Sequence, residues 1–324
     1  MSKAIKIWLI VAGALVMAGA LMFVSVMSTM EWNFMRLSTE KYETNKHEIS
    51  ENFENISIKT DTSDIVFLLS SDEKCRVECY ESKKEKHSVD VIDGVLHITS
   101  VNEKRWYDYV HIGFGSCPKL KIYLPKSEYE ELYIKESTGD VELSEDLEFK
   151  SIDISLSTGD VKCNASAKNE LKIKVGTGDV FLENISAGSI DLRTSTSDIK
   201  ATNTDCDGDV TIAVSTGDFI FSNVECKNLI STGTTGGAVL SNVIAIEKID
   251  IKRGTGDISF DSCDAAEIVV NTTTGDVKGS LLSDKVFITD TDTGRVDVPE
   301  TITGGKCKIT TDTGDIKISI RAGE

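Results

Sequence analysis

The stretch "KVGTGDVFLENIS", residues 174–186, places a Thr-Gly-Asp tripeptide between two short segments in which apolar and polar residues alternate. The position of its threonine recurs every 19 or 20 residues, at Thr138, Thr158, Thr177, Thr196, Thr216, Thr235, Thr255, Thr274, Thr293 and Thr313. Glycine follows in every unit except one, where Ser197 replaces it. Aspartate completes all but two units, which carry Gly237 and Arg295. The chain is therefore an internal repeat.

Alternation on both sides of a glycine turn predicts two short strands per unit, each with one buried face. A unit of this length cannot bury its apolar face alone, but stacked units can. We therefore predict an all-β fold, a parallel β-solenoid of about ten coils over residues 131–324, in which Val161 lies beside Val180 in a parallel strand. An antiparallel sandwich would not explain so constant a period.

Residues 50–130 are less regular, and we expect them to cap the solenoid. "FENISIKTDTSDIVFLL" (53–69) resembles a divergent coil, "DVIDGVLHITS" (90–100) a hairpin and "PKLKIYLP" (118–125) a strand. Residues 31–49 carry mixed charge without a strand pattern, so we expect a stalk there.

The segment from Ile7 to Met30 contains no charged residue. At about 1.5 Å per residue it is long enough for a transmembrane helix. A cleaved signal peptide is the alternative, but the apolar run continues past the small residues Ala18-Gly19-Ala20. Lysines precede the segment, so residues 1–6 are expected in the cytoplasm and the rest outside. The predicted location is a bacterial cytoplasmic membrane, crossed once.

Thirty-five Lys and Arg against 53 Asp and Glu give a formal charge of -18. Such a charge disfavours nucleic acid as a partner. Cell-wall polymer, envelope proteins, or a second copy bound through the solenoid ends are the partners we consider.

The repeated aspartates should form a column with carboxylates about 5 Å apart, which repel one another by about 1 kcal/mol in water. Calcium between coils could offset this, and the candidate ligands are Asp140, Asp160, Asp179, Asp198 and Asp218. The alternative, which we favour, is that each carboxylate bonds to its own turn. Arg295 is expected between Asp276 and Asp315, where it could pair with both.

Eight cysteines form no Cys-x-x-Cys pair, and buried free thiols are the simplest interpretation. Cys206 and Cys226 both fall ten residues after their threonine, so a disulfide between neighbouring coils is an open alternative. All four histidines precede the repeats, and isolated surface histidines are expected. With uniform coils and no insertion to build a pocket, we predict no enzyme, and no cofactor is indicated.

Aromatic and basic residues gather in "NEKRWYDYVHIGFG" (102–115). This segment is either a binding loop, with Arg105, Trp106, Tyr107 and Tyr109 as contact residues, or a cover for the open end of the solenoid.

The "STGDV" turns (137–141 and 157–161), "VDVIDGVLHI" (89–98) and "KLKIYLP" (119–125) resemble the bacterial adhesin-like β-strand repeat family, a domain family of unknown function. The resemblance covers residues 50 to 320 or so. It implies a β-repeat fold behind a single membrane helix and, for some members, an association with envelope stress systems. It implies no catalytic motif.

The sequence thus predicts a membrane-anchored extracytoplasmic binding or scaffold module. Two alternatives remain: a self-assembling filament, because the last coil "GDIKISIRAGE" (314–324) could leave an open sheet edge, and a polysaccharide-cleaving β-helix enzyme.

Overall fold

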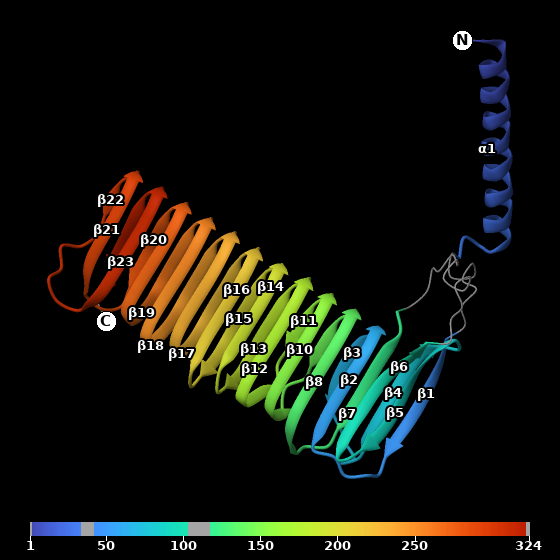
Figure 1. Ribbon diagram of the computed structural model, residues 1–324, viewed down its shortest axis with the longest axis horizontal. Coiled ribbons are helices and arrows are strands. Elements are labelled where there is room, and N and C mark those ends of the chain that lie inside the picture. The colour runs from blue at the N-terminus through green and yellow to red at the C-terminus, as the bar shows by residue number, and fades with distance from the viewer. Residues whose placement is uncertain (1, 34–41, 103–116, 322–324) are drawn as a thin grey trace.

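The computed structural model describes residues 2–33, 42–102 and 117–321, which form one helix and 24 strands of a single sheet (Figure 1). The elements before the repeats are α1 (Lys3–Thr29), β1 (Tyr42–Ile49), β2 (Asn55–Thr62), β3 (Asp64–Leu69), β4 (Cys75–Ser82), β5 (Glu85–Ile92), β6 (Val95–Asn102) and β7 (Lys119–Leu124). The repeats begin with β8 (Glu128–Thr138), β9 (Val141–Leu143), β10 (Glu148–Thr158), β11 (Val161–Cys163), β12 (Ser166–Thr177), β13 (Val180–Ala187), β14 (Ile190–Thr196), β15 (Ile199–Cys206) and β16 (Asp209–Thr216). They continue with β17 (Phe219–Thr235), β18 (Ala238–Thr255), β19 (Ile258–Thr274), β20 (Val277–Leu281), β21 (Lys285–Thr293), β22 (Val296–Asp297), β23 (Gly305–Thr313) and β24 (Ile316–Ile320).

Helix α1 begins at the N-cap Ser2, whose side chain accepts a hydrogen bond from the Ile5 N–H at 3.4 Å. Its mean hydropathy is 2.5, and nearly all of its large apolar side chains are exposed. The helix is long and apolar enough to span a membrane, a test that an N-terminal signal sequence also passes.

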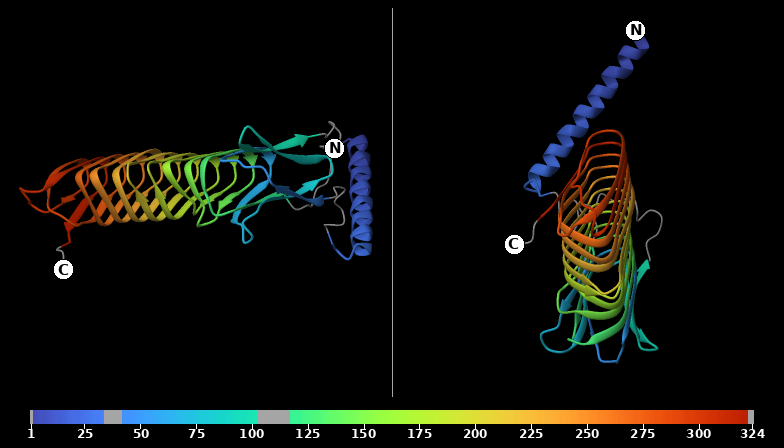
Figure 2. Two further views of the ribbon diagram at one scale, coloured as in Figure 1. Left: turned by 90° about the horizontal axis from the view of Figure 1, so that it is seen from below. Right: turned by 90° about the vertical axis from the view of Figure 1, so that its left-hand side faces the viewer.

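Strands β8 to β19 form the regular part of the solenoid. Each strand pairs in parallel with the strand one unit further on, and Val161 lies opposite Val180 as the period predicts. The coils are nested in an end-on view, and their long sides run parallel (Figure 2). The predicted parallel β-solenoid is confirmed.

Inward side chains of successive coils stack into columns, so the core is continuous along the whole rod. Phe67, Phe149, Phe219 and Phe221 are its largest fully buried side chains. An inward position of β18 holds a charge: Arg253 crosses over Gly233 and stacks on the Phe219 ring at 4.9 Å. Burial lowers the pKa of this guanidinium, and Gly233 is needed because any Cβ there would collide with it.

At the C-terminal end the coils are not stacked in chain order. β23 pairs with β19 on one side and with β21 on the other, and β24 likewise lies between β20 and β22. The prediction that Arg295 lies between two aspartates is therefore wrong, since Asp315 lies between Asp276 and Arg295. The open sheet edge consists of β21, β22 and the last residues of β24, because β24 pairs with β20 along its whole length but with β22 only at Ile316 and Lys317.

At the N-terminal end, too, the coils are not stacked in chain order. The coil made by β2 and β3 lies between two others. β8 and β9 pair with it on the inner side, and β6 and β7, which precede them in the chain, pair with it on the outer side. β5 and β6 form the expected hairpin, in which Asp93 and Gly94 both have positive φ.

Residues 42–49, assigned to the stalk from sequence, form strand β1 and pair antiparallel with β4. This strand lacks an apolar alternation because polar contacts stabilise it. Lys46 pairs with Glu78 at 2.7 Å, and the Tyr42 ring stacks on Tyr80 with 5.1 Å between centroids.

Candidate functional site

The Thr-Gly-Asp corner depends on its glycine. Gly178 has φ +128, and a Cβ added there would lie 2.1 Å from the Gly159 carbonyl oxygen of the preceding coil. Both the backbone conformation and the close approach of neighbouring coils exclude a side chain. Ser63 and Ser197, which replace the glycine in two coils, are not among the residues with positive φ.

The aspartate of the corner bonds between coils. Asp160 Oδ1 accepts the Asp179 N–H at 2.8 Å, and Asp179 Oδ1 accepts the Asp198 N–H at 2.9 Å. The same bond links Asp64, Asp140, Asp160, Asp179, Asp198, Asp218 and Gly237 in order, and Asp257, Asp276, Asp315 and Arg295 further on. We name this set the aspartate ladder. The carboxylate serves the next coil, which corrects the interpretation that it serves its own turn, and the N–H dipoles offset the repulsion between neighbours.

All five candidate calcium ligands belong to this ladder. Each commits its Oδ1 to a backbone N–H, so a cation would have to share that oxygen or use the other one. Calcium binding at these aspartates stays a prediction.

A second corner carries an asparagine ladder that the sequence analysis missed. Asn184, Asn203, Asn223 and Asn242 have φ between 50 and 55, and each side-chain N–H₂ donates to the Oδ1 of the preceding one at 2.9–3.0 Å. Asparagine tolerates this left-handed conformation better than most residues. The signal was available, because each asparagine stands seven residues after its threonine.

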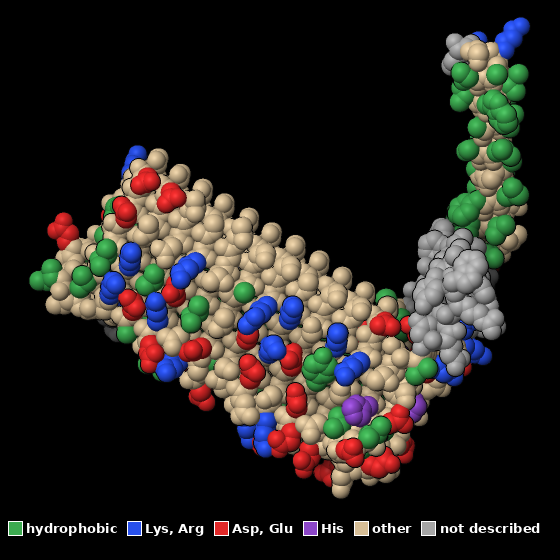
Figure 3. Space-filling model, viewed as in Figure 1, with side chains coloured by type: hydrophobic (Ala, Val, Ile, Leu, Met, Phe, Trp, Pro, Cys, Tyr) green, Lys and Arg blue, Asp and Glu red, His purple; other side chains and the backbone are tan. Residues whose placement is uncertain are grey.

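The outer face formed by β8, β10, β12, β14, β16 and the second halves of β17 to β19 carries the clearest surface pattern (Figure 3). A band without charge follows the threonine edge, and beside it runs a row of basic side chains. In register, the row contains Lys59, Lys135, Lys174, Arg193 and Lys252, and the positions between them are held by Ser155, Ala213 and Thr232. We name this surface the basic face.

A shallow groove of 680 Å³ crosses five coils of the basic face. It exists because the residue before each corner threonine is small, and its floor is made by Ser157, Gly176, Ser195, Ser215 and Thr234. Lys174 and Arg193 stand at its rim, and Arg193 also pairs with Asp191 at 2.9 Å. The groove offers hydroxyls, backbone and two cations to an extended ligand.

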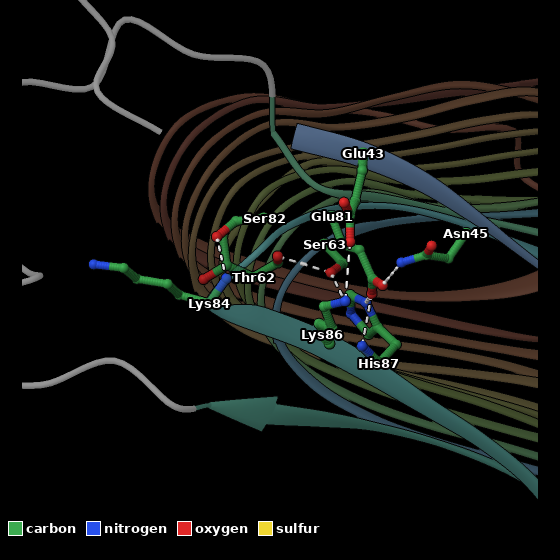
Figure 4. A network of polar contacts seen from close by, with 9 residues as sticks. All are labelled: Glu43, Asn45, Thr62, Ser63, Glu81, Ser82, Lys84, Lys86 and His87. Carbon is green, nitrogen blue, oxygen red and sulfur yellow. Dashed lines mark hydrogen bonds and ion pairs between the residues drawn. The ribbon is translucent and has the colours of Figure 1, made fainter. Parts of the chain in front are cut away.

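The N-terminal cap contains a buried polar network (Figure 4). Glu81 Oε2 accepts the His87 backbone N–H at 2.6 Å and lies 2.7 Å from His87 Nδ1, while Glu81 Oε1 accepts from Asn45 Nδ2 at 2.6 Å. His87 Nε2 lies 3.1 Å from Ser63 Oγ. His87 is 7% exposed, so the expectation of an isolated surface histidine is wrong at this position. His111 lies outside the described residues.

The order Ser63, His87, Glu81 resembles the nucleophile, base and acid of a hydrolase, but its surroundings do not allow that chemistry. Ser63 is 1% exposed, and its hydroxyl donates to the Thr62 carbonyl at 2.7 Å. Its only proton is thus committed away from the imidazole, and His87 Nε2 acts as donor to Ser63 Oγ. The arrangement connects the cap to the first coil.

Ser63 also joins the network to a second buried carboxyl. Its backbone N–H donates to Glu136 Oε1 at 3.2 Å, and the Thr60 hydroxyl donates to Glu136 Oε2. Burial raises the pKa of Glu136 to about 8 against a usual value of 4.5, so this carboxyl is largely protonated at neutral pH.

Cys206 and Cys226 are buried free thiols in strands that pair in parallel, one coil apart. Burial raises the pKa of Cys226 to about 12 and that of Cys206 in the same direction. The disulfide stays a prediction. The predicted contact residues Arg105, Trp106, Tyr107 and Tyr109 lie outside the described residues.

With this geometry in hand, the comparisons with known proteins identify the family. A family model described as Toastrack DUF4097 matches residues 53–213 and 204–323. The chain belongs to the Toastrack DUF4097 family. The adhesin-like resemblance derived from the repeats is therefore confirmed. No curated protein matches the sequence.

Three solved structures extend the comparison of the Toastrack fold. A Parabacteroides distasonis protein whose name suggests lipid binding is 14% identical, with a TM-score of 0.50, over 87% of this chain and 98% of its own. A Parabacteroides merdae protein whose name suggests an adhesin is 13% identical, with a TM-score of 0.46, over 87% and 98%. A Bacteroides fragilis protein with a similar name is 14% identical, with a TM-score of 0.42, over 86% and 97%. At 14% identity the likeness to the Parabacteroides distasonis protein shows the fold alone.

Proposed function

We propose that this Toastrack protein is a membrane-anchored, extracytoplasmic binding module without catalytic activity, which holds a partner in the cell envelope by many weak contacts along the rod. The observation that carries the proposal is the uninterrupted repetition from Glu128 to Leu281, which leaves no insertion to build a catalytic cleft and lets one shallow groove run across five coils. Multivalent contact turns individually weak interactions into useful avidity.

The proposed surface is the basic face, and the proposed partner is an extended anionic polymer of the cell wall. Lys174 and Arg193 at the rim of the groove suit such a ligand although the whole chain is acidic. The name of the Parabacteroides distasonis neighbour suggests a binding role too, which is consistent with this proposal.

Two experiments test this function. Protease treatment of intact cells should release the solenoid if it lies outside, and should leave it intact if it lies in the cytoplasm. Co-sedimentation with purified cell walls should then fall at least 5-fold in the double variant Lys174→Gln/Arg193→Gln. The matched control Lys162→Gln/Lys200→Gln changes the same charge on another face and should bind normally; equal loss in both would refute the basic face as the site.

A second candidate function, self-assembly through the C-terminal end, is favoured by the open edge of β21 and β22. Val286, Ile288 and Val296 are exposed there, and so is Ile302 in the loop that follows. An apolar edge with unpaired backbone can pair with another chain. Light scattering of the purified chain distinguishes the two: assembly that disappears in Ile288→Lys supports it, and a monomer at all concentrations excludes it.

A further inference from the structure

Cys79, Glu81 and His87 bring three metal-binding side chains together in the β4–β5 hairpin. One ligand atom from each lies within 4.8 Å of the other two, and all three residues are buried. Cys79 and Glu81 alternate along β4 and so share its inner face, while His87 reaches the same point from β5. Within the described residues this is the one such group found.

We propose that this hairpin binds Zn²⁺ through Cys79 Sγ, Glu81 and His87 Nδ1. A thiolate, an imidazole and a carboxylate are the ligand types that zinc accepts in tetrahedral sites. Hard cations such as Ca²⁺ and Mg²⁺ prefer oxygen alone, so the cysteine and histidine argue against them.

The contacts around His87 support coordination through Nδ1. A metal-bound histidine usually donates its other ring N–H to an oxygen, which fixes the ring. Ser63 Oγ already accepts from His87 Nε2 at 3.1 Å, because its own proton goes to Thr62. Nδ1 is thereby left facing Glu81.

The distances require little movement. Glu81 Oε2 and His87 Nδ1 are 2.7 Å apart. Zinc bonds of about 2.0–2.2 Å at a tetrahedral angle would separate these two atoms to about 3.3 Å. These two atoms would therefore move apart by well under 1 Å, and Cys79 Sγ, which lies within 4.8 Å of both, would complete the set of three ligands.

Charge balance suits a buried site. Without metal, burial raises the pKa of the Cys79 thiol to about 12, with Glu81 adding to the effect, so the thiol keeps its proton. Zinc would take the place of the thiol proton when Cys79 Sγ binds as a thiolate. Zn²⁺ with one thiolate, one carboxylate and a neutral imidazole has no net charge, which removes the cost of burying a charged group.

The test uses the full chain in detergent under reducing conditions, titrated first with Co²⁺ and then with Zn²⁺. We expect one Co²⁺ per chain, with the near-ultraviolet charge-transfer band of a cobalt thiolate, and loss of that band when Zn²⁺ displaces it. Cys79→Ser should abolish the band. The matched control is Cys75→Ser, since Cys75 is a buried cysteine on the same strand and face. It should leave the band unchanged.

A second measurement on the unaltered chain does not depend on any variant folding. Calorimetry of Zn²⁺ binding should give saturable binding at one site per chain. A chain that binds no Co²⁺ or Zn²⁺, or a thiolate band that survives in Cys79→Ser, would overturn the proposal and leave the three residues as a hydrogen-bond network only. Neither result bears on binding at the basic face.

Discussion

The regular coils and the N-terminal cap provide hydrogen-bond partners for their polar groups in opposite ways. In the coils, polar groups at each corner are satisfied by the same residue in the next coil, as in the aspartate and asparagine ladders. In the cap, Glu81, His87 and Glu136 of three different strands and Ser63 of the turn between β2 and β3 satisfy one another once. Repetition makes the first arrangement visible in the sequence, whereas the second depends on contacts between residues up to 73 positions apart.

The largest loss of stability is expected when a glycine of the regular coils is replaced. Gly178→Ala should lower the free energy of unfolding by about 4–6 kcal/mol, since the methyl group would collide with the Gly159 carbonyl and the φ of +128 is strained for alanine. Thermal unfolding, monitored by circular dichroism, measures this loss of stability.

The control for this change is Ser197→Ala, at the corner that already carries a side chain. It should cost less than about 1 kcal/mol. Equal losses at the two corners would show that close stacking of the coils does not explain the glycine.

Glu136 tests the cap through pH. Its pKa of about 8 in the folded chain exceeds the usual 4.5. Between these values the unfolded chain loses the proton while the folded chain keeps it, so this group's contribution to stability falls as pH rises from 4.5 to 8 and is constant on either side. At pH 7 the loss amounts to about 3 kcal/mol.

Glu136→Gln should therefore be more stable than the natural chain by up to about 3 kcal/mol at pH 7 and no more stable at pH 4. Chemical denaturation at several pH values measures the difference. Glu131→Gln, an exposed change on the same strand, should show no such slope. A constant difference between the Glu136 variant and the natural chain across this range would contradict the burial of an ionisable carboxyl.

Substitutions in the aspartate ladder should change the free energy of unfolding by less than the two changes above. Asp179→Ala removes the acceptor for the Asp198 N–H and should cost about 1–2 kcal/mol. Asp179→Asn keeps an acceptor oxygen and removes a charge, so it should be neutral or slightly stabilising. If asparagine costs as much as alanine, the negative charge and not the hydrogen bond is what the corner requires.

These contrasts also explain how far the sequence could be interpreted. Period and alternation predicted the parallel register, because every coil repeats the same inward columns. The order of the last coils was not predicted, since Thr274, Thr293 and Thr313 keep the usual spacing whichever coil is outermost.

A signal for that order was nevertheless present. The inward residues of the outermost coil include Lys285, Thr289 and Thr291, as suits an end with a neighbour on one side only, whereas Ile309 and Ile316 of the inserted coil are fully buried. The cap network had no comparable signal. Nothing in the spacing of Ser63, Glu81 and His87 shows that they meet, because the hairpin and the coil that join them differ from every other unit.

The smallest expected effect concerns calcium on the aspartate ladder. A site with a Kd of about 1 mM would stabilise the chain by about 1.4 kcal/mol at 10 mM Ca²⁺. Because Asp140, Asp160, Asp179, Asp198 and Asp218 already give one oxygen each to the backbone, we expect less than half of this. Thermal unfolding in Ca²⁺, with Mg²⁺ at equal concentration to account for screening, measures it. Stabilisation by Ca²⁺ alone that disappears in Asp179→Asn would instead establish the predicted calcium site, and the ladder would then hold the coils together through a cation as well as through its hydrogen bonds.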